Sequence, residues 1–249
     1  MKCKLCLRKV DLLKKSHIIP DFMHKEIFDE KHRMIKFTTQ TPNSETSVPS
    51  SEYESNVLCK KCDNEVIGNL ETYVSRVLFG GRVRVATKNY IKPDGLEFTQ
   101  VSGLDYKKFK LFLLSLLWRA SISSRSFFGN VNLGPYEDEI REMILKGDPF
   151  MSGDFPCIIT SYRKHNLPKE IVAEPKKIRL NTNIGYNFLI GGFMYIFKII
   201  KNDKTKWILE AAVNKNGEVK IIHTPKKQAA DLLAGYFGVR FEDHPDYKD

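Results

Sequence analysis

Two cysteine pairs with the same spacing constrain this chain more than any other feature of its sequence. Cys3 and Cys6 form the first C-x-x-C pair, and Cys59 and Cys62 form the second. Each pair places two thiolates at a separation that suits one tetrahedral Zn²⁺, and two pairs complete a four-sulfur site. A redox C-x-x-C or free thiols are the alternatives. Two pairs in one short region favour a structural zinc site over both.

The cysteine usage, the N-terminal residues and the lengths of the apolar runs indicate the cellular compartment. Cys157 lies in the apolar stretch FPCIIT, which predicts a buried core thiol. Four paired cysteines and one left over are typical of a reducing compartment, so we expect a cytoplasmic protein. Met1 leads straight into the first pair, so no signal peptide is expected. No apolar run reaches the length of a membrane span, so no membrane partner is expected.

Charge and composition narrow the class of partner. The chain has 249 residues, of which 42% are hydrophobic, so a packed core is expected rather than disorder. Its formal net charge of +10 favours a polyanionic partner such as nucleic acid. A soluble surface rich in lysine is the alternative explanation.

A histidine motif between the two pairs carries a resemblance to a known family. The motif is Ser16-His17-Ile18-Ile19-Pro20, and NVLCKKCDN follows downstream. Together with the first pair, these stretches resemble the HNH endonuclease family in its zinc-knuckle form, a treble-clef-like or ββα-metal module. The resemblance covers about residues 1–80. Two later stretches, LLSLLWRASISS and LGPYEDEIREMIL, resemble parts of a longer bacterial family that carries this module.

The resemblance implies roles for particular residues. His17 would be the general base that activates water, since a near-neutral pKa lets an imidazole accept a proton at physiological pH. Asp63 stands where family members carry a ligand for a catalytic divalent metal, and a carboxylate there would suit Mg²⁺ or Mn²⁺. An acidic residue in a first helical turn also has a purely structural explanation. Asn56 would orient the histidine or lie near the scissile phosphate, with Glu54 as its rival.

The sequence departs from the family pattern in two places. Many members have an acidic metal ligand directly before the catalytic histidine, where this chain has Ser16. Asp21 is a candidate to replace that ligand. No Gly-Gly follows the His-Ile-Ile-Pro run. Both departures argue against an active nuclease. Ser16 favours the rival hypothesis, a non-catalytic zinc knuckle that binds nucleic acid or protein as a subunit of a larger complex.

A run of basic residues near the second pair is the candidate nucleic-acid surface. Phosphate contacts of this kind are sequence-independent and sensitive to salt. A solvated helix face is the alternative. The residues are Lys60, Lys61, Arg76, Arg82 and Arg84.

Periodicity predicts the secondary structure. Helices are expected over 21–31, 62–79, 105–123, 136–148 and 226–238. Strands are expected near His17 and over 33–40, 155–163, 186–201, 205–213 and 218–224. A hairpin over 82–101 would turn at residues 93–95 and a second at 214–217, and 41–55 would be a loop.

These observations predict an α+β protein with two parts. Residues 1–90 would form the zinc-stabilised HNH-like module, and residues 105–249 a helical and mixed β-rich region that binds a partner protein, positions substrate or regulates. The resemblance implies metal-dependent cleavage of DNA, in a bacterial anti-phage or mobile-element setting. The sequence does not distinguish DNA from RNA.

Overall fold

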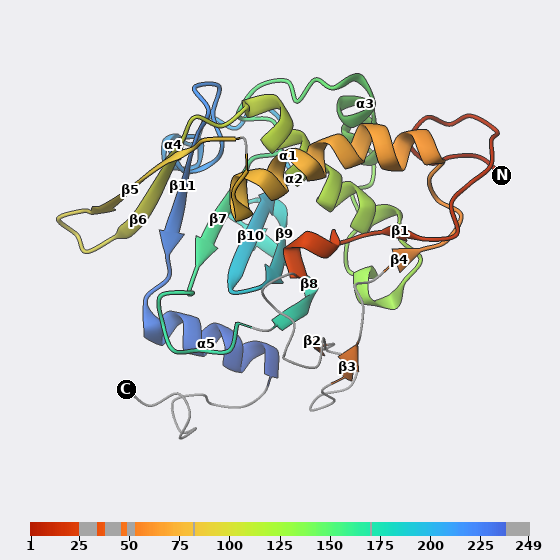
Figure 1. Ribbon diagram of the computed structural model, residues 1–249. Coiled ribbons are helices and arrows are strands. Elements are labelled where there is room, and N and C mark those ends of the chain that lie inside the picture. Colours follow the sequence, from red (N-terminus) through yellow and green to blue (C-terminus); the bar gives the residue numbers. More distant parts are fainter. Residues whose placement is uncertain (25–33, 38–45, 49–52, 82, 170, 238–249) are drawn as a thin grey trace.

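A mixed β-sheet forms the centre of the molecule (Figure 1). The computed structural model describes residues 1–24, 34–37, 46–48, 53–81, 83–169 and 171–237. The strands of the sheet are β2 (Met34–Phe37), β3 (Thr46–Val48), β5 (Ala86–Ile91), β6 (Glu97–Ser102), β7 (Cys157–Ser161), β8 (Ile171–Leu180), β9 (Asn183–Ile190), β10 (Phe193–Lys198) and β11 (Glu218–His223). Seven of them follow the order β8-β9-β10-β7-β11-β6-β5, and β2 and β3 extend the sheet beyond β8. The pairs β2–β8 and β7–β11 are parallel and the other pairs antiparallel.

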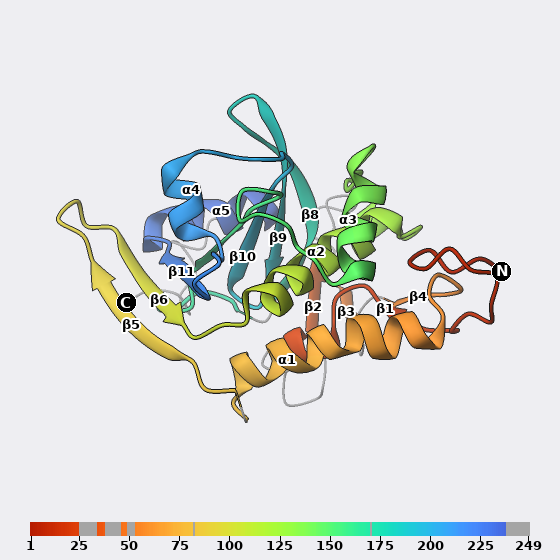
Figure 2. The same cartoon turned by 90° about the horizontal axis from the view of Figure 1, so that it is seen from above.

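Helices cover both faces of this sheet because successive side chains of a strand point to opposite faces. On one face, Ile159 and Phe197 join the main core with α2 (Tyr106–Ile122) and α3 (Tyr136–Lys146). On the other face, Ile158 packs with α4 (Lys206–Ala211), and Leu189 packs with α5 (Lys226–Phe237). Figure 2 shows α1 (Gly68–Phe79) running along the outside of α2. The hairpin of β5 and β6 projects from the opposite end of the molecule to the N-terminus.

The N-terminal part adds a small second sheet to this body. β1 (Ser16–His17) pairs antiparallel with β4 (Tyr53–Glu54), with His17 opposite Tyr53. A 3₁₀ turn over Asp21–His24 follows β1. A π-helical stretch over Lys61–Ile67 begins within the second cysteine pair and leads directly into α1.

Local sequence signals explain most of the element boundaries. The Asp105 carboxylate caps α2 by accepting a hydrogen bond from the Lys108 backbone N–H at 3.0 Å. Gly147 ends α3 in the left-handed conformation, with a φ of 69°. Gly191 and Gly192, both with positive φ, make the two-residue turn between β9 and β10.

Several predicted elements are confirmed. The helices expected over 62–79, 105–123, 136–148 and 226–238 correspond to the π-helical stretch with α1, α2, α3 and α5. The strands near His17 and over 33–40, 155–163 and 218–224 are present as β1, β2, β7 and β11. The 82–101 hairpin is present, and Gly95 in its turn has a φ of 84°. Cys157 is buried, and burial raises the pKa of its thiol.

Other predictions were wrong. Residues 205–213 are not a strand, because Ile208 and Ala211, three residues apart, face the sheet from a helix that starts at Lys206. The turn at 214–217 therefore joins α4 to β11 rather than two strands. The stretch 186–201 is a hairpin rather than one strand, since it folds back at Gly191-Gly192. The predicted loop over 41–55 contains β3 and β4. Residues 25–31 of the helix expected over 21–31 lie outside the described residues.

The two predicted parts share one hydrophobic core. Cys3 and Leu58 belong to the same buried cluster as Trp118 and Val219. The stretch around the expected boundary forms β6, which pairs with β11. The division into residues 1–90 and 105–249 stays a prediction.

Candidate functional site

The four paired cysteines meet at one point. The Sγ atoms of Cys3, Cys6, Cys59 and Cys62 all lie within 4.8 Å of one another, and none forms a disulfide. Tetrahedral zinc with Zn–S bonds of about 2.3 Å requires sulfurs about 3.8 Å apart, so this donor set fits a zinc ion. Cys6 is partly exposed and the other three are buried. The structure thus supports zinc binding by the predicted ligands.

Backbone hydrogen bonds hold the two pairs together. The Cys3 N–H donates to the Arg8 carbonyl at 3.0 Å, which closes the first turn. The Cys59 N–H donates to the Cys3 sulfur at 3.4 Å, a contact typical of cysteine knuckles around a metal. Residues 56 positions apart in the chain are therefore joined directly at the site.

The thiols differ in acidity because their surroundings differ. Burial alone would raise the pKa of Cys6, but hydrogen bonds from the backbone and side chain of Arg8 bring that pKa down to about 6. Burial raises the pKa of Cys3 and of Cys62. Only thiolates ligate zinc, so all four cysteines would lose their protons when the ion binds.

His17 lies on β1 and is open to solvent. Its side chain is 38% exposed, and its Nε2 lies 3.5 Å from an oxygen of Asp21, four residues later. His24, in the same 3₁₀ turn, is buried instead. Burial lowers the pKa of His24 to about 4, so that ring is neutral at physiological pH. Of these two neighbouring histidines, His17 is the solvent-accessible one.

Asp63 sits where the second cysteine pair turns into helix. It lies in the first turn of the π-helical stretch, and its N–H donates to the Cys59 carbonyl at 3.0 Å. Burial raises the pKa of its carboxyl, against the opposing effects of the Ser16 hydroxyl and of the charges on Arg119 and His17. The Ser16 hydroxyl that acts on this carboxyl is itself buried. Asp63 therefore lies close enough to Ser16, Arg119 and His17 for all three to act on its carboxyl.

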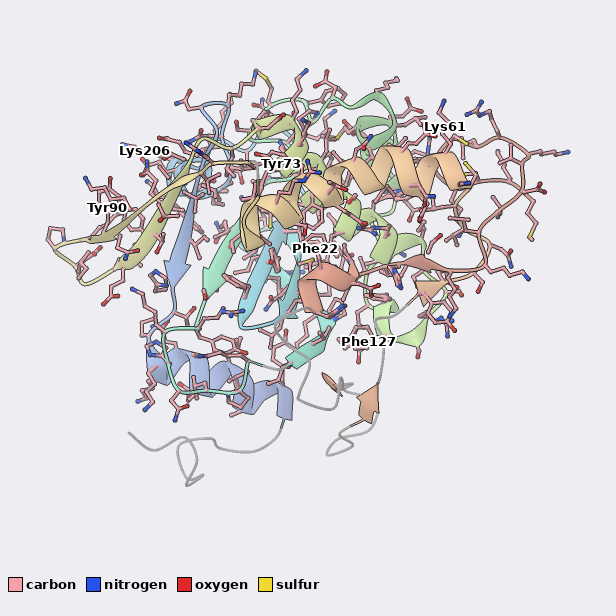
Figure 3. All side chains as sticks on the ribbon, viewed as in Figure 1. Phe22, Lys61, Tyr73, Tyr90, Phe127 and Lys206 are labelled. Atoms are coloured by element: carbon pink, nitrogen blue, oxygen red, sulfur yellow. The ribbon has the colours of Figure 1, made fainter. Side chains whose placement is uncertain are left out.

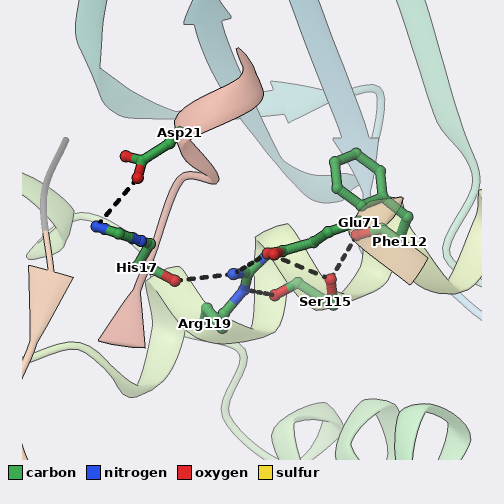
Figure 4. Close-up of polar contacts among 6 residues, drawn as sticks. All are labelled: His17, Asp21, Glu71, Phe112, Ser115 and Arg119. Carbon is green, nitrogen blue, oxygen red and sulfur yellow. Dashed lines mark hydrogen bonds and ion pairs between the residues drawn. The ribbon is translucent and has the colours of Figure 1, made fainter. Parts of the chain in front are cut away.

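A buried arginine on α2 fixes the strand that carries His17 (Figure 4). Arg119 is 2% exposed. Its Nη1 donates to the His17 carbonyl at 2.8 Å and to Glu71 of α1 at 2.7 Å, and its Nε donates to the Ser115 carbonyl at 3.2 Å. One side chain therefore ties β1, α1 and α2 together.

The two candidates for the residue that orients His17 lie in different surroundings. Asn56 is exposed, has a φ of 60° and donates its N–H to the Leu13 carbonyl at 2.9 Å. Glu54 is buried, and its carboxylate accepts hydrogen bonds from the Ser123 hydroxyl and from the N–H and hydroxyl of Ser124. Glu54 thus anchors β4 to the end of α2. The role of Asn56 stays a prediction.

The predicted basic residues spread along one helix rather than gathering at a point. Lys60 and Lys61 are exposed beside the second cysteine pair, and Lys61 lies at that end of the helix in Figure 3. Arg76 lines an open groove along α1 together with Asp63, Glu71 and other residues. Arg84 is exposed beyond the end of α1, and Arg82 lies outside the described residues.

Among the described residues, the four cysteines are the only group of three or more potential metal-binding side chains close enough to share an ion. In the part of the chain that the structure describes, no third potential metal-binding side chain forms such a group with Asp63 and His17. The predicted Mg²⁺ or Mn²⁺ site therefore stays a proposal. No helix in the described part of the chain is long and apolar enough to cross a membrane.

Sequence reasoning missed the positioning role of Arg119, Glu71 and the serines after α2. One signal was present: Arg119 follows the apolar run LFLLSLLW. A charged side chain on a buried helix requires a partner. The identity of that partner, 48 residues away, is not visible in the sequence.

Comparison of the chain with protein-family models, with curated proteins and with solved structures gave no match.

Proposed function

We propose that this protein is a metal-dependent HNH-type endonuclease that hydrolyses phosphodiester bonds in DNA. The observation that supports this function best is the placement of His17. A solvent-accessible imidazole lies on a short two-stranded sheet, near enough to Asp63 to act on its carboxyl, and Asp63 directly follows Cys62 of the four-cysteine cluster.

His17 would act as the general base. With the carboxylate of Asp21 at 3.5 Å, Nε2 is favoured as the protonated nitrogen, which leaves Nδ1 to accept a proton from the attacking water. The hydrogen bond from Arg119 to the His17 carbonyl would hold the strand so that the ring keeps its place. Asp21 and Arg119 are therefore positioning residues.

Asp63 would hold the divalent cation. Mg²⁺ commonly uses only one or two carboxylates and completes its shell with waters and substrate phosphates. One partly buried carboxylate fits such a substrate-completed site. When bound, the cation supplies positive charge against the charge that develops on the phosphorus oxygens.

The rival function is a non-catalytic zinc knuckle that binds nucleic acid or a protein partner. Its support is Ser16, which occupies the place of a second acidic ligand and is buried. A single carboxylate near His17 is also compatible with no cation site at all. A role in anti-phage defence and a partner for the C-terminal region stay proposals.

The experiment is cleavage of supercoiled plasmid by the full chain with Mg²⁺ or Mn²⁺, and with EDTA as the blank. The nuclease hypothesis expects nicking or linearisation that is lost in His17→Ala and Asp63→Asn while zinc content is unchanged. Asp11→Asn is the matched control, since Asp11 is an exposed acid in the same part of the chain. Absence of cleavage by the wild type with either metal would reject the nuclease and favour the binding module.

A further inference from the structure

Two cations stack on one tyrosine ring beside His17. Lys15 Nζ lies 4.9 Å from the centroid of the Tyr53 ring, and the Arg125 guanidinium carbon lies 5.4 Å from it. The three residues come from the segment before β1, from β4 and from the segment after α2. Tyr53 is directly opposite His17 in the β1–β4 pair. Residues opposite one another share a face of the sheet with Cβ atoms about 5 Å apart, so this cluster adjoins the imidazole.

Hydrogen bonds hold the Arg125 side of the cluster in place. Arg125 Nε donates to the Tyr53 carbonyl at 3.1 Å. The neighbouring Glu54 carboxylate fixes Ser123 and Ser124, which immediately precede Arg125. Each cation also gains from its contact with the ring face. Little side-chain entropy would therefore be lost when an anion binds.

Both cations are exposed, and the Glu54 carboxylate, which feels the charge of Arg125, already accepts hydrogen bonds from Ser123 and Ser124. Among the described residues, neither Lys15 nor Arg125 forms a salt bridge with a carboxylate. The two Nη groups of Arg125 make no hydrogen bond with any of the described residues. They therefore remain available to bind two oxygens of a phosphate. The surrounding segment 1–15 is strongly basic, with Asp11 its single acid; its basic residues are Lys2, Lys4, Arg8, Lys9, Lys14 and Lys15.

We propose that Lys15, Tyr53 and Arg125 form a phosphate clamp that binds the backbone of a nucleic-acid strand next to the phosphate presented to His17. The cutting of that strand rests on the function proposed above, whereas binding by the clamp does not. Nucleic acid is favoured over an acidic protein because the cations lie beside a candidate phosphodiester-cleaving imidazole and leave a guanidinium edge free. The clamp would set which phosphate reaches the base.

The test is fluorescence anisotropy with a labelled 20-nucleotide single strand, its duplex and the matching RNA, in EDTA and over a range of salt concentrations. The test variant is Lys15→Ala with Arg125→Ala. The control is Lys204→Ala with Lys206→Ala, which removes the same charge from exposed positions. Figure 3 shows Lys206 at the opposite end of the molecule from Lys61, the residue before Cys62.

Loss of two phosphate contacts should weaken single-strand binding about 25-fold at 0.1 M salt, and duplex binding about 60-fold. The slope of log affinity against log salt should fall by roughly 1.4 and 1.8 respectively. The control should bind within about twofold of wild type. Which of the three probes binds most tightly identifies the nucleic acid. Should the alanine pair not fold, Lys15→Gln with Arg125→Gln replaces it.

Two results would overturn the clamp. One is a test variant that binds all three probes as the wild type does, and the other is a control that loses as much affinity as the test variant. Tight binding of polyglutamate that also depends on Lys15 and Arg125 would reject nucleic acid as the occupant. Clamp-dependent binding by the wild type without any cleavage would reject the nuclease and retain the clamp.

Discussion

Replacement of Arg119 by alanine should lower the free energy of unfolding by about 3 kcal/mol. The change leaves Glu71 without its ion pair and the His17 carbonyl without its donor. Breaking a buried ion pair from one side costs about 3–5 kcal/mol. The lower end applies here because the Glu71 side chain is 26% exposed and can recover some hydration. A loss of this size is a large part of the roughly 5–15 kcal/mol that stabilises a typical domain.

Urea unfolding of the zinc-loaded protein, followed by far-UV circular dichroism and tryptophan fluorescence, would measure the change. Trp118 is buried next to Arg119 in the sequence and should report on this part of the core, whereas Trp207 is 58% exposed. Arg84→Ala is the control, since Arg84 is exposed and its removal should change stability by less than about 0.5 kcal/mol.

A double-mutant cycle isolates the pair. Glu71→Gln alone should cost less than Arg119→Ala, because glutamine can still accept a hydrogen bond from the guanidinium. The coupling between the two positions should be about 1–3 kcal/mol. If Arg119→Ala does not fold, Arg119→Lys keeps the charge but cannot reach all of its present acceptors at once. A loss below about 1 kcal/mol for Arg119→Ala, or no coupling, would refute the view that this side chain fixes β1.

Three further predictions concern metal, pH and the backbone. Removal of zinc by a chelator, or Cys59→Ser, should abolish cooperative unfolding of the N-terminal part, because structural zinc contributes about 10–16 kcal/mol in small zinc modules; an unchanged urea midpoint would contradict this. His24 has a folded-state pKa of about 4 against an ordinary value of 6.5, so the unfolded chain takes up the proton first and stability should fall by about 3 kcal/mol as pH drops from about 6.5 to 4. His24→Leu should flatten that part of the pH profile, and an identical profile would reject the assignment. Gly217→Ala should lower Tm far more than Gly95→Ala: both have positive φ, but a Cβ at Gly217 would collide with the Leu104 backbone, whereas none lies within 4 Å at Gly95.

Local signals explain why much of the secondary structure was predictable. The continuous apolar periodicity of α2 and the acidic first turn of α3 each act within one element, so the sequence displays them directly. The Pro-Asp-Gly turn between β5 and β6 is local in the same sense. The strand predicted over 205–213 failed because a short apolar run suits a strand or a buried helix equally well. Its packing against Ile158, on a distant strand, favours the helix.

The residues of the candidate site also fall into two groups, those that local sequence predicts and those that only tertiary packing brings together. The sequence by itself determined the four cysteine ligands, since the C-x-x-C spacing fixes each pair within a single turn, and it placed Asp63 at the start of the helix that follows. Only the tertiary structure decided that Arg119 holds the strand of His17 and that Lys15 and Arg125 meet on Tyr53. Contacts between residues up to 102 positions apart depend on how whole helices and strands pack, and no local pattern encodes that packing.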